Sequence, residues 1–349
     1  MATIKDVARK AGVSVTTVSR AFNNYLDISS ETRARILEVA HELEYVPNAV
    51  AQHLVTRKGK LLGVFMEDRA NAGLTHPFFI EVLNGFRKVI GELGYDLLVF
   101  ANVQEEKSAW NYVQRARQRG VDGILLCGIL QDDPALPLLT QSGIPTVAID
   151  LPLEGENIGW VTSDNAQAMI SLVTWLKDCG YTRIAHVYGQ LDTYTGRERY
   201  TAFYEAMRLK GFEIMPKWWR DGDFMLQGGY EAAEAIIKSS DEIPEIFCCA
   251  SDMMAIGVMQ YLHANQLRVP EDVSVLGFDD IQLASKLSPA LTTIRQEKED
   301  LGHEAALMLI DIIEHKLTQH MRIVSTRLVE RRTTRCRREG SFHDEKGIS

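Results

Sequence analysis

Two short amphipathic helices joined by a tight turn are predicted near the start of this 349-residue chain. Apolar residues recur at helical spacing from Ile4 to Ala11, which places them on one buried stripe. Gly12 follows that stripe, where a left-handed cap of the helix C-terminus costs least. Ser14 can then cap a second helix by accepting a backbone N–H two or three residues further on. A helix pair this small buries little surface, so we expect its outer face to bind another molecule.

A third helix is predicted after Ser29 and Ser30, because hydroxyl side chains cap helices and Glu31 suits the positive end of the helix dipole. We expect its apolar face to be formed by Ile36, Leu37, Ala40 and Leu43. This arrangement is typical of a helix-turn-helix domain, whose second helix enters the major groove of DNA. An ordinary helical hairpin with a solvated polar face is the alternative. Residues 45–54 are predicted to form a short segment that is too short to be stable as an isolated helix.

Charge is divided unevenly along the chain. The first sixty residues hold nine Lys and Arg against six Asp and Glu, a net charge of +3. The remaining residues hold 29 basic and 41 acidic side chains, a net charge of −12. A basic head on an acidic body indicates a small nucleic-acid-binding module. Candidate phosphate contacts are Lys5, Arg9, Lys10, Arg33, Arg35, Lys58 and Lys60.

From Lys60 onward, short β-branched strands alternate with amphipathic helices. Such alternation predicts parallel sheets covered by helices on both faces, and the length suits two doubly wound α/β lobes. We expect strands at 61–66, 95–100, 121–127, 145–149, 183–188, 245–249 and 273–277. We expect helices at 78–93, 110–119, 166–179, 196–210, 229–238, 253–265 and 303–315.

Polar and aromatic side chains stand where several of these strands end. Asp150, Asp164 and Asp279 each follow a strand, and Arg199 lies early in a helix that follows one. Because ligands bind at the carboxyl ends of parallel strands, we expect a cleft between the two lobes. Carboxylates accept hydroxyl hydrogens, arginine donates to two acceptors at once, and aromatic rings stack on C–H faces. The combination suits a polyhydroxylated ligand.

Residues 3–64 resemble the N-terminal domain of the lactose repressor/galactose repressor family of bacterial transcription regulators, and the resemblance continues to about Thr334. It implies a helix-turn-helix head and hinge helix, followed by a two-lobed core like that of periplasmic binding proteins. The DNA-binding residues that it implies are Thr3, Lys5, Val15, Thr16, Thr17, Arg20, Asn23, Ala51, Leu54 and Val55. Arg20 is suited to bond O6 and N7 of a guanine, and Leu54 is suited to wedge into the minor groove.

The same resemblance assigns an effector pocket. The residues that it implies there are His76, Phe78, Phe79, Asp150, Asp164, Arg199, Phe224, Ser251 and Asp279. Arg197 is the alternative to Arg199, since it lies two positions away. We expect Asp252 to cap the helix that follows it, and the pair Trp218-Trp219 to be a surface or core pair rather than a platform for a ligand.

The chain is therefore divided into a head (1–46), a hinge helix and linker (47–60), an effector-binding and dimerisation core (61–335), and a polar tail (336–349). The resemblance implies a repressor of a carbohydrate-use operon, controlled by a sugar or sugar derivative bound between the lobes. A homodimer on a pseudo-palindromic operator is expected, because a two-fold protein requires a two-fold site. A purine corepressor is the alternative effector. A sugar-binding or glycoside-processing protein without regulation is the alternative class.

Several other classes find no support in the sequence. The nucleotide-binding, zinc-protease and hydrolase motifs GxGxxG, GxxxxGK[ST], HExxH and GxSxG are absent at usable positions, so no enzyme, cofactor or metal is expected. With no long apolar run and no signal sequence, we expect a cytoplasmic protein. No leucine heptad follows residue 331, which disfavours a tetramerising coiled coil. We expect reduced thiols rather than disulfides or zinc ligands at Cys127, Cys179, Cys248, Cys249 and Cys336.

Overall fold

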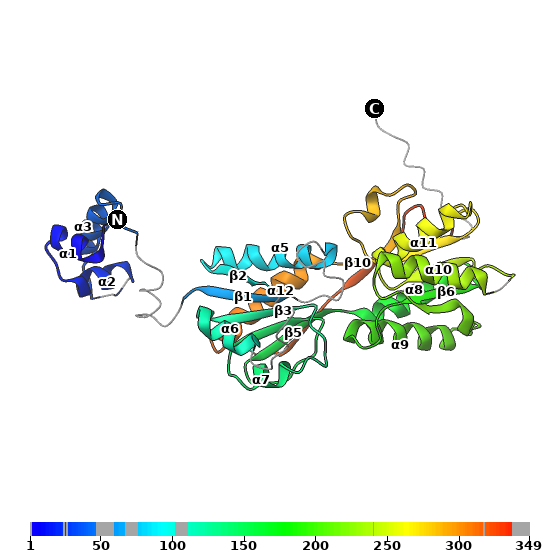
Figure 1. The fold of residues 1–349 in the computed structure, drawn as a ribbon, viewed down its shortest axis with the longest axis horizontal. Coiled ribbons are helices and arrows are strands. Elements are labelled where there is room, and N and C mark those ends of the chain that lie inside the picture. The colour runs from blue at the N-terminus through cyan, green and yellow to red at the C-terminus, as the bar shows by residue number, and fades with distance from the viewer. Residues whose placement is uncertain are drawn as a thin grey trace, which may run out of the picture.

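The computed structural model describes residues 2–23, 25, 27–46, 59–66, 76–101, 111–239, 241–316 and 318–336 (Figure 1). The head (blue in Figure 1) consists of α1 (Ile4–Ala11), α2 (Val15–Phe22) and α3 (Ser30–Glu42). Gly12 ends α1 in the predicted left-handed conformation, with φ +67°. The Ser14 hydroxyl accepts the backbone N–H of Thr17 at 3.1 Å, and Ser29 caps α3 in the same way. The predicted helices and caps are thus confirmed.

The three helices of the head enclose a small apolar core in which Val7, Val18 and Ile36 are fully buried. Leu37 was expected to join them, but its side chain is 44% exposed, so this prediction is wrong. Val39 packs against the core instead. A helix turns by about 100° per residue, so the residue directly after Ile36 lies beyond the edge of the buried stripe, whereas the third residue returns to it.

The first lobe is a parallel sheet of six strands in the order β11-β5-β4-β3-β1-β2. Its strands are β1 (Leu61–Met66), β2 (Asp96–Phe100), β3 (Gly123–Cys127), β4 (Thr146–Ile149), β5 (Ile158–Ser163) and β11 (Met321–Val324). One face packs against α5 (Pro77–Glu92) and α12 (Lys298–Ile313). The other face packs against α6 (Asn111–Arg119) and α7 (Leu136–Thr140). The lobe therefore has two apolar cores, one on each face of the sheet.

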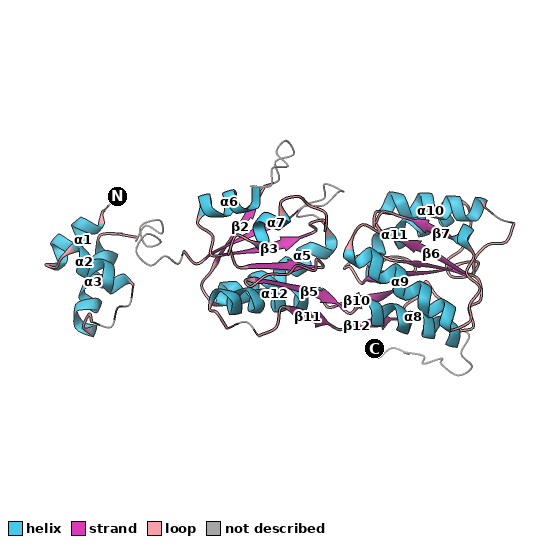
Figure 2. Ribbon diagram, turned by 90° about the horizontal axis from the view of Figure 1, so that it is seen from below, coloured by secondary structure: helices cyan, strands magenta, loops and turns pink. Residues whose placement is uncertain are grey.

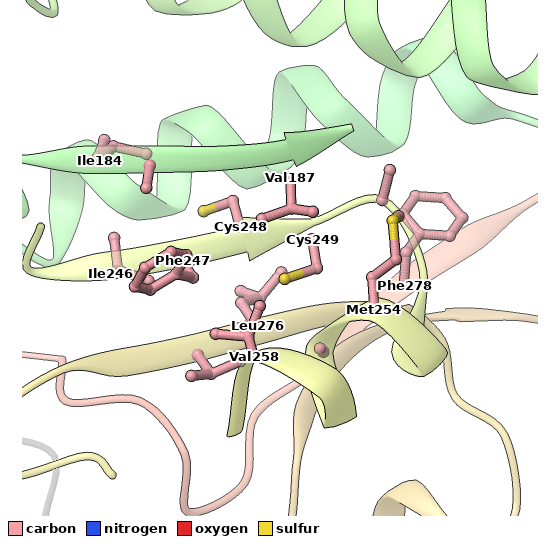
Figure 3. Close-up of a cluster of buried hydrophobic side chains, with 14 of the residues drawn as sticks. Ile184, Val187, Ile246, Phe247, Cys248, Cys249, Met254, Val258, Leu276 and Phe278 are labelled. Atoms are coloured by element: carbon pink, nitrogen blue, oxygen red, sulfur yellow. The ribbon is translucent and has the colours of Figure 1, made fainter. Parts of the chain in front are cut away.

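The second lobe repeats this plan in the order β12-β10-β9-β8-β6-β7, with β12 as its antiparallel edge strand. Its strands are β6 (Ile184–Tyr188), β7 (Trp219–Asp221), β8 (Ile246–Cys249), β9 (Ser274–Asp279), β10 (Thr292–Gln296) and β12 (Thr326–Val329). Its helices are α8 (Asn165–Asp178), α9 (Tyr194–Leu209), α10 (Leu226–Lys238) and α11 (Asp252–Ala264). The core between them includes Phe247 and Cys248 of β8 (Figure 3). Trp218 and Trp219 are both buried there, which agrees with a core pair.

The chain passes between the lobes three times, from β5 to α8, from β10 to α12 and from β11 to β12. Figure 2 shows β5 and β11 of the first lobe meeting β10 and β12 of the second. Residues at these passages belong to both lobes at once. Asp164, which caps the N-terminus of α8, and Lys298, which begins α12, therefore lie at the junction.

All seven predicted strands and seven predicted helices of the core are present, with ends shifted by up to five residues. The strands β7, β10, β11 and β12 and the helix α7 were not predicted, and β5 was anticipated only through Asp164, which was expected to follow a strand. Most of these are short or lie at a sheet edge, and β10 reads Thr-Thr-Ile-Arg-Gln, which is too polar to stand out as a strand. Within the described ranges, no helix is long and apolar enough to cross a membrane.

The expectation of five reduced thiols is wrong for two of them. Cys179 and Cys336 form a disulfide, with 4.5 Å between their Cα atoms and 157 residues between them in the chain. Local spacing of cysteines carries no information about such a distant pair, because only the fold returns residue 336 to the end of α8. Cys127, Cys248 and Cys249 are free and buried, as expected. Cys336 is the first residue of the predicted polar tail, and the rest of that tail lies outside the described residues.

Candidate effector cleft and nucleic-acid interface

The exposed face of α2 carries three of the ten residues predicted to contact DNA. Val15 is 40% exposed, and Thr16 and Arg20 are exposed as well. The opposite face of the helix, with Val18, is buried in the head. A helix with one face fixed in a small core and the other open to solvent can enter a DNA groove without unfolding.

Arg20 is held against the head by two contacts. Its guanidinium forms an ion pair with Asp27 at 2.8 Å and lies 5.2 Å from the ring centre of Tyr25. Both partners follow α2 in the chain and are exposed. Because exposed ion pairs contribute little stability, Arg20 can leave Asp27 for a stronger acceptor at low cost.

The other predicted DNA-binding residues divide into three groups. Thr3 and Lys5 are exposed at the start of α1. Thr17 and Asn23 are half-buried and take part in the caps of α2, since the Asn23 amide donates to the carbonyl of Ser19 at 2.9 Å. The predicted hinge residues Ala51, Leu54 and Val55 lie outside the described residues.

In the core, Arg199 on α9 is the centre of a buried polar cluster. Its Nε donates to Asn165 Oδ1 at 2.8 Å, and its Nη1 donates to the carbonyl of Ala250 at 2.7 Å. The guanidinium also lies 3.7 Å from the ring centre of Phe278. Burial lowers the pKa of Arg199, although the carboxylates around it, Asp279 first among them, oppose that shift. The alternative, Arg197, is exposed, so Arg199 is the arginine that lies inside the structure.

Asp279 faces Arg199 from the end of β9. Its Oδ1 lies 3.7 Å from Arg199 Nη1 and accepts a hydrogen bond from the Gln296 amide at 2.6 Å. The amine of Lys298 donates to the backbone carbonyls of Asp279 and Asp280 at 2.7 and 2.9 Å, which fixes this strand end. Burial raises the pKa of Asp279 to about 6.

Asp150 and Asp164 lie at the ends of β4 and β5. Asp150 adopts a left-handed backbone conformation (φ +57°) and accepts a hydrogen bond from the Thr162 hydroxyl at 2.6 Å. Burial raises its pKa, and Arg199 acts in the opposite direction. Asp164 caps α8 by accepting the backbone N–H of Gln167 at 3.1 Å. Asp164 is therefore a helix cap beside the cluster, while its neighbour Asn165 contacts Arg199 directly.

Ser251 and Phe224 complete the cluster on the second lobe. The buried Ser251 hydroxyl accepts the backbone N–H of Met254 at 3.2 Å, so Ser251 caps α11. It also donates to the carbonyl of Phe224 at 3.4 Å. Phe224 is half-buried, with φ +57°, and its ring centre lies 6.0 Å from the guanidinium carbon of Arg199.

The prediction that Asp252 caps α11 is wrong. Ser251 already has the extended backbone of a capping residue, which makes Asp252 the first residue within the helix. The Asp252 carboxylate instead accepts the backbone N–H of Ile281 at 2.8 Å and the Thr293 hydroxyl at 2.6 Å. Burial raises the pKa of Asp252 well above its ordinary value. Its role is to hold the loop after β9 next to β10.

The three predicted aromatic and imidazole residues of the first lobe lie at the start of α5. His76 caps this helix, since its Nδ1 accepts the backbone N–H of Phe78 at 3.3 Å. Phe78 is buried in the core of the first lobe, and Phe79 is half-buried beside the His76 ring. Lys298 connects this helix to the cluster, because its amine also lies 3.7 Å from Glu81 of α5.

Four residues join the two lobes beside this cluster, and of these only Arg197 was named from the sequence, as the alternative to Arg199. The ring of Tyr194 packs against Trp160 of β5, and Arg197 donates to Gln131 in the loop after β3. Burial raises the pKa of Tyr194 to about 12, and the nearby carboxylates of Glu198, Asp150 and Asp164 add to that shift. The sequence gives no signal for such contacts, because they depend on how one lobe sits against the other.

The groups of this cluster suit the binding of a ligand. Carboxylate, guanidinium and hydroxyl groups converge next to the rings of Phe224 and Phe278, which is the composition of a binding site. Among the described residues, no group of three or more His, Cys, Asp and Glu side chains could hold a metal ion.

Comparison with known proteins identifies both parts of the chain. Residues 3–48 match the family described as bacterial regulatory proteins, lacI family, and residues 173–334 match the periplasmic binding protein-like domain. The chain is 34% identical to the ribose operon repressor of Escherichia coli (strain K12) over 322 residues, covering 91% of this chain and 94% of that one. It is 32% identical to the HTH-type transcriptional repressor PurR of Haemophilus influenzae (strain PittEE) over 340 residues, 96% and 99% of the two chains.

Solved structures share the fold along nearly the whole chain. The Lac repressor dimer bound to operator and the anti-inducer ONPF has a TM-score of 0.84 and 26% identity, covering 95% of this chain and 99% of that one. The complex of the transcriptional regulator CelR with cellobiose has a TM-score of 0.72 and 28% identity, covering 95% and 100%. The expected helix-turn-helix head and two-lobed α/β core are thereby confirmed.

Proposed function

Because this chain belongs to the lacI family of bacterial regulatory proteins, we propose that it represses transcription as a homodimer bound to a pseudo-palindromic operator. The family consists of regulators and not of enzymes. We assign residues 1–46 to the DNA-binding head, 47–60 to the hinge helix and linker, 61–335 to the core and 336–349 to a polar tail. We place the protein in the cytoplasm, where a bacterial repressor meets its operator.

The main support for DNA binding is the exposed face of α2. Val15, Thr16 and Arg20 stand there on a helix that is fixed from behind by a closed core. We assign DNA contacts to these residues and to Thr3, Lys5, Thr17 and Asn23, with Ala51, Leu54 and Val55 as the hinge contacts. Selection of bound sequences from a random DNA pool by the full chain tests the assignment. Two inverted half-sites are the expected result, and a pool without enrichment contradicts it.

We propose that the buried cluster around Arg199 is the effector-binding site. Its charged groups favour a neutral, hydroxyl-rich ligand. The guanidinium is already engaged by Asn165, Ala250 and Asp279. A phosphate would have to displace these partners and would meet the carboxylates of Asp150 and Asp279, whereas sugar hydroxyls can donate to those carboxylates. We therefore propose a sugar effector bound between the lobes. A relative described as the ribose operon repressor and a structural neighbour solved with cellobiose support this class.

The proposed effector residues are His76, Phe78, Phe79, Asp150, Asp164, Arg199, Phe224, Ser251 and Asp279. Thermal unfolding of the full chain with neutral pentoses, hexoses and disaccharides tests the class, because a ligand that binds only the folded protein raises its melting temperature. Sugar phosphates and purines belong in the same panel. A larger shift with a purine would favour a purine corepressor, for which the PurR relative is the precedent. A larger shift with a sugar phosphate would contradict a neutral ligand.

A matched pair of variants on α9 tests the site itself. Arg199→Ala removes a buried donor and one of the two counter-charges of Asp279, so binding of the sugar identified above should weaken at least tenfold, or about 1.4 kcal/mol. Arg208→Ala removes an exposed arginine from the same helix and should leave binding unchanged. Operator affinity without ligand should stay the same in both variants. Unaltered sugar binding in Arg199→Ala would refute the site.

A further inference from the structure

The disulfide between Cys179 and Cys336 joins two distant parts of the second lobe. Cys179 is the C-cap of α8, and its side chain is buried. Cys336 is half-buried and packs against the same core. The bond therefore fastens the last described residues of the chain to the end of a core helix.

The segment that leads to Cys336 is also held by hydrogen bonds that involve no sulfur. The backbone N–H of Thr292 donates to the Thr333 hydroxyl at 2.8 Å, and the carbonyl of Thr333 accepts the backbone N–H of Val275 at 2.8 Å. Thr333 is fully buried. The segment thus runs along β9 and β10 whether or not the disulfide is present.

Tyr181 brings the two cysteines into register. It lies two residues after Cys179, and its hydroxyl accepts the backbone N–H of Arg335 at 2.9 Å and donates to Ser274 at 3.0 Å. Arg335 immediately precedes Cys336. A hydrogen bond between the neighbours of both cysteines keeps the sulfur atoms close in the reduced protein too, and such proximity favours ring closure strongly.

The other three cysteines are unsuited to thiol chemistry. Cys127, Cys248 and Cys249 are buried, and burial raises the pKa of each thiol. Figure 3 shows Cys248 and Cys249 surrounded by apolar side chains such as Phe247. Since the thiolate is the reactive form, these residues are protected from oxidation. Thiol reactivity is therefore concentrated in the pair that contains the half-buried Cys336.

We propose that Cys179 and Cys336 form a reversible redox site, which low-molecular-weight disulfides oxidise and thiols reduce. In the reducing cytoplasm proposed above, the resting form is the dithiol. Oxidation fastens the C-terminal segment to α8 and stabilises the second lobe. Only the resting dithiol form of the site rests on the proposed cytoplasmic location. The redox reaction itself does not depend on the effector or the operator.

The exchange proceeds in two steps that balance. The half-buried Cys336 thiolate attacks one sulfur of the small disulfide, which forms a mixed disulfide and releases one small thiolate. The Cys179 thiolate then attacks the Cys336 sulfur, forming the internal bond and releasing the second small thiolate. Two electrons pass from the protein to the small disulfide, and the two protons lost by the cysteines end on the two released thiols.

Thiol mapping of the full chain tests the proposal. The protein is reduced with dithiothreitol, equilibrated with oxidised and reduced glutathione, alkylated under denaturing conditions and digested. We expect Cys179 and Cys336 to become protected together in one linked peptide pair, while the other three cysteines stay open to alkylation. Dithiothreitol should reverse the protection. The oxidised form should melt about 5–10 °C higher than the reduced form.

Two variants separate the redox site from general effects. Cys336→Ser should abolish the difference in melting temperature between oxidising and reducing conditions. Tyr181→Phe removes the hydroxyl that accepts from Arg335 and should slow disulfide formation several-fold, whereas Tyr204→Phe, at an exposed position on α9, should not. A persistent mixed disulfide of glutathione on Cys336, or free thiols at both positions in excess oxidised glutathione, would overturn the proposal.

Discussion

The ring of Tyr194 packs edge-on against the ring of Trp160, with 5.4 Å between the ring centres and 80° between the planes. Tyr194 begins α9 in the second lobe, and Trp160 lies on β5 in the first. In the same helical turn, Arg197 donates to Gln131, again in the first lobe. The first turn of α9 therefore touches the opposite lobe at two points, beside the Arg199 cluster.

Tyr194→Ala is expected to weaken sugar binding by about 2- to 10-fold, because an aromatic pair contributes about 0.5–1.5 kcal/mol beyond its buried area. Without this contact, the ligand itself must supply more of the free energy that keeps the lobes together. Calorimetric titration with the sugar found by thermal unfolding measures the effect. Leu209→Ala, which shortens a side chain that is 75% exposed at the end of α9, serves as the control. Equal affinities in all three proteins would count against a role for the Tyr194–Trp160 contact.

The residues that the sequence predicted well are those fixed by local structure. Asp150 and Asp279 end predicted strands, and parallel strands bring their carboxyl ends to one edge, so the two lie near Arg199 as expected. The caps Ser14 and Ser29 were equally predictable, because capping requires only a few neighbouring residues.

Contacts between distant segments were not predictable from the same patterns. The Tyr194–Trp160 pair depends on the placement of one lobe against the other, and no periodicity in either segment encodes that placement. Cys179 and Cys336 illustrate the same limit, since the spacing of cysteines suggested free thiols. Asp252 was predicted to cap the helix that follows it. The helix begins one residue earlier than predicted, so Ser251 is the cap and Asp252 is the first residue of the helix.

Gly302 is expected to tolerate no side chain. A Cβ atom at this position of α12 would lie 1.9 Å from the carbonyl oxygen of Val82 in α5, so Gly302→Ala must push two helices of the first lobe apart. We expect a loss of about 1–3 kcal/mol in the free energy of unfolding, measured by urea denaturation. Gly91→Ala is the matched control, because a Cβ at this position of α5 meets no atom within 4 Å. It should stabilise the protein slightly by improving helix propensity.

His186 should make the second lobe less stable at mildly acidic pH. Its Nδ1 lies 2.9 Å from the carbonyl of Cys248, its ring stacks on Phe203, and burial lowers its pKa from the ordinary 6.5 to about 4. The unfolded chain thus binds a proton between these two pH values that the folded chain does not. The neutral His186 therefore contributes to the free energy of unfolding in full above pH 6.5. This contribution, about 3 kcal/mol in total, is lost as the pH falls to about 4.

Urea denaturation at pH 7 and pH 5 measures this dependence against the variant His186→Gln, which has no titrating group at the position. The wild type should lose more stability than the variant on acidification. Asp279 acts in the opposite direction, because its raised pKa of about 6 adds stability below pH 3.8 that is lost as the pH rises through 6. The comparison with His186→Gln cancels that contribution. A parallel loss in both proteins would show that His186 is not the group responsible.

Arg20 is expected to supply sequence discrimination rather than general DNA affinity. Its ion pair with Asp27 and its position over Tyr25 keep the guanidinium at the exposed face of α2, ready to exchange an exposed carboxylate for the O6 and N7 atoms of a guanine. Arg20→Ala should therefore weaken operator binding by about 1–3 kcal/mol while changing binding to random DNA little.

Lys5→Ala is the control variant that distinguishes a phosphate contact from a base contact. Lys5 is exposed at the start of α1, where its amine can reach a phosphate but reads no base, so its loss should weaken operator and random DNA by the same factor. It should also lower the slope of log affinity against log salt concentration by about one. Both variants are titrated by fluorescence anisotropy against the selected operator and a scrambled duplex at several salt concentrations. If Arg20→Ala lost affinity equally for the two duplexes, Arg20 would be a phosphate contact like Lys5, and another residue of α2 would have to read the base.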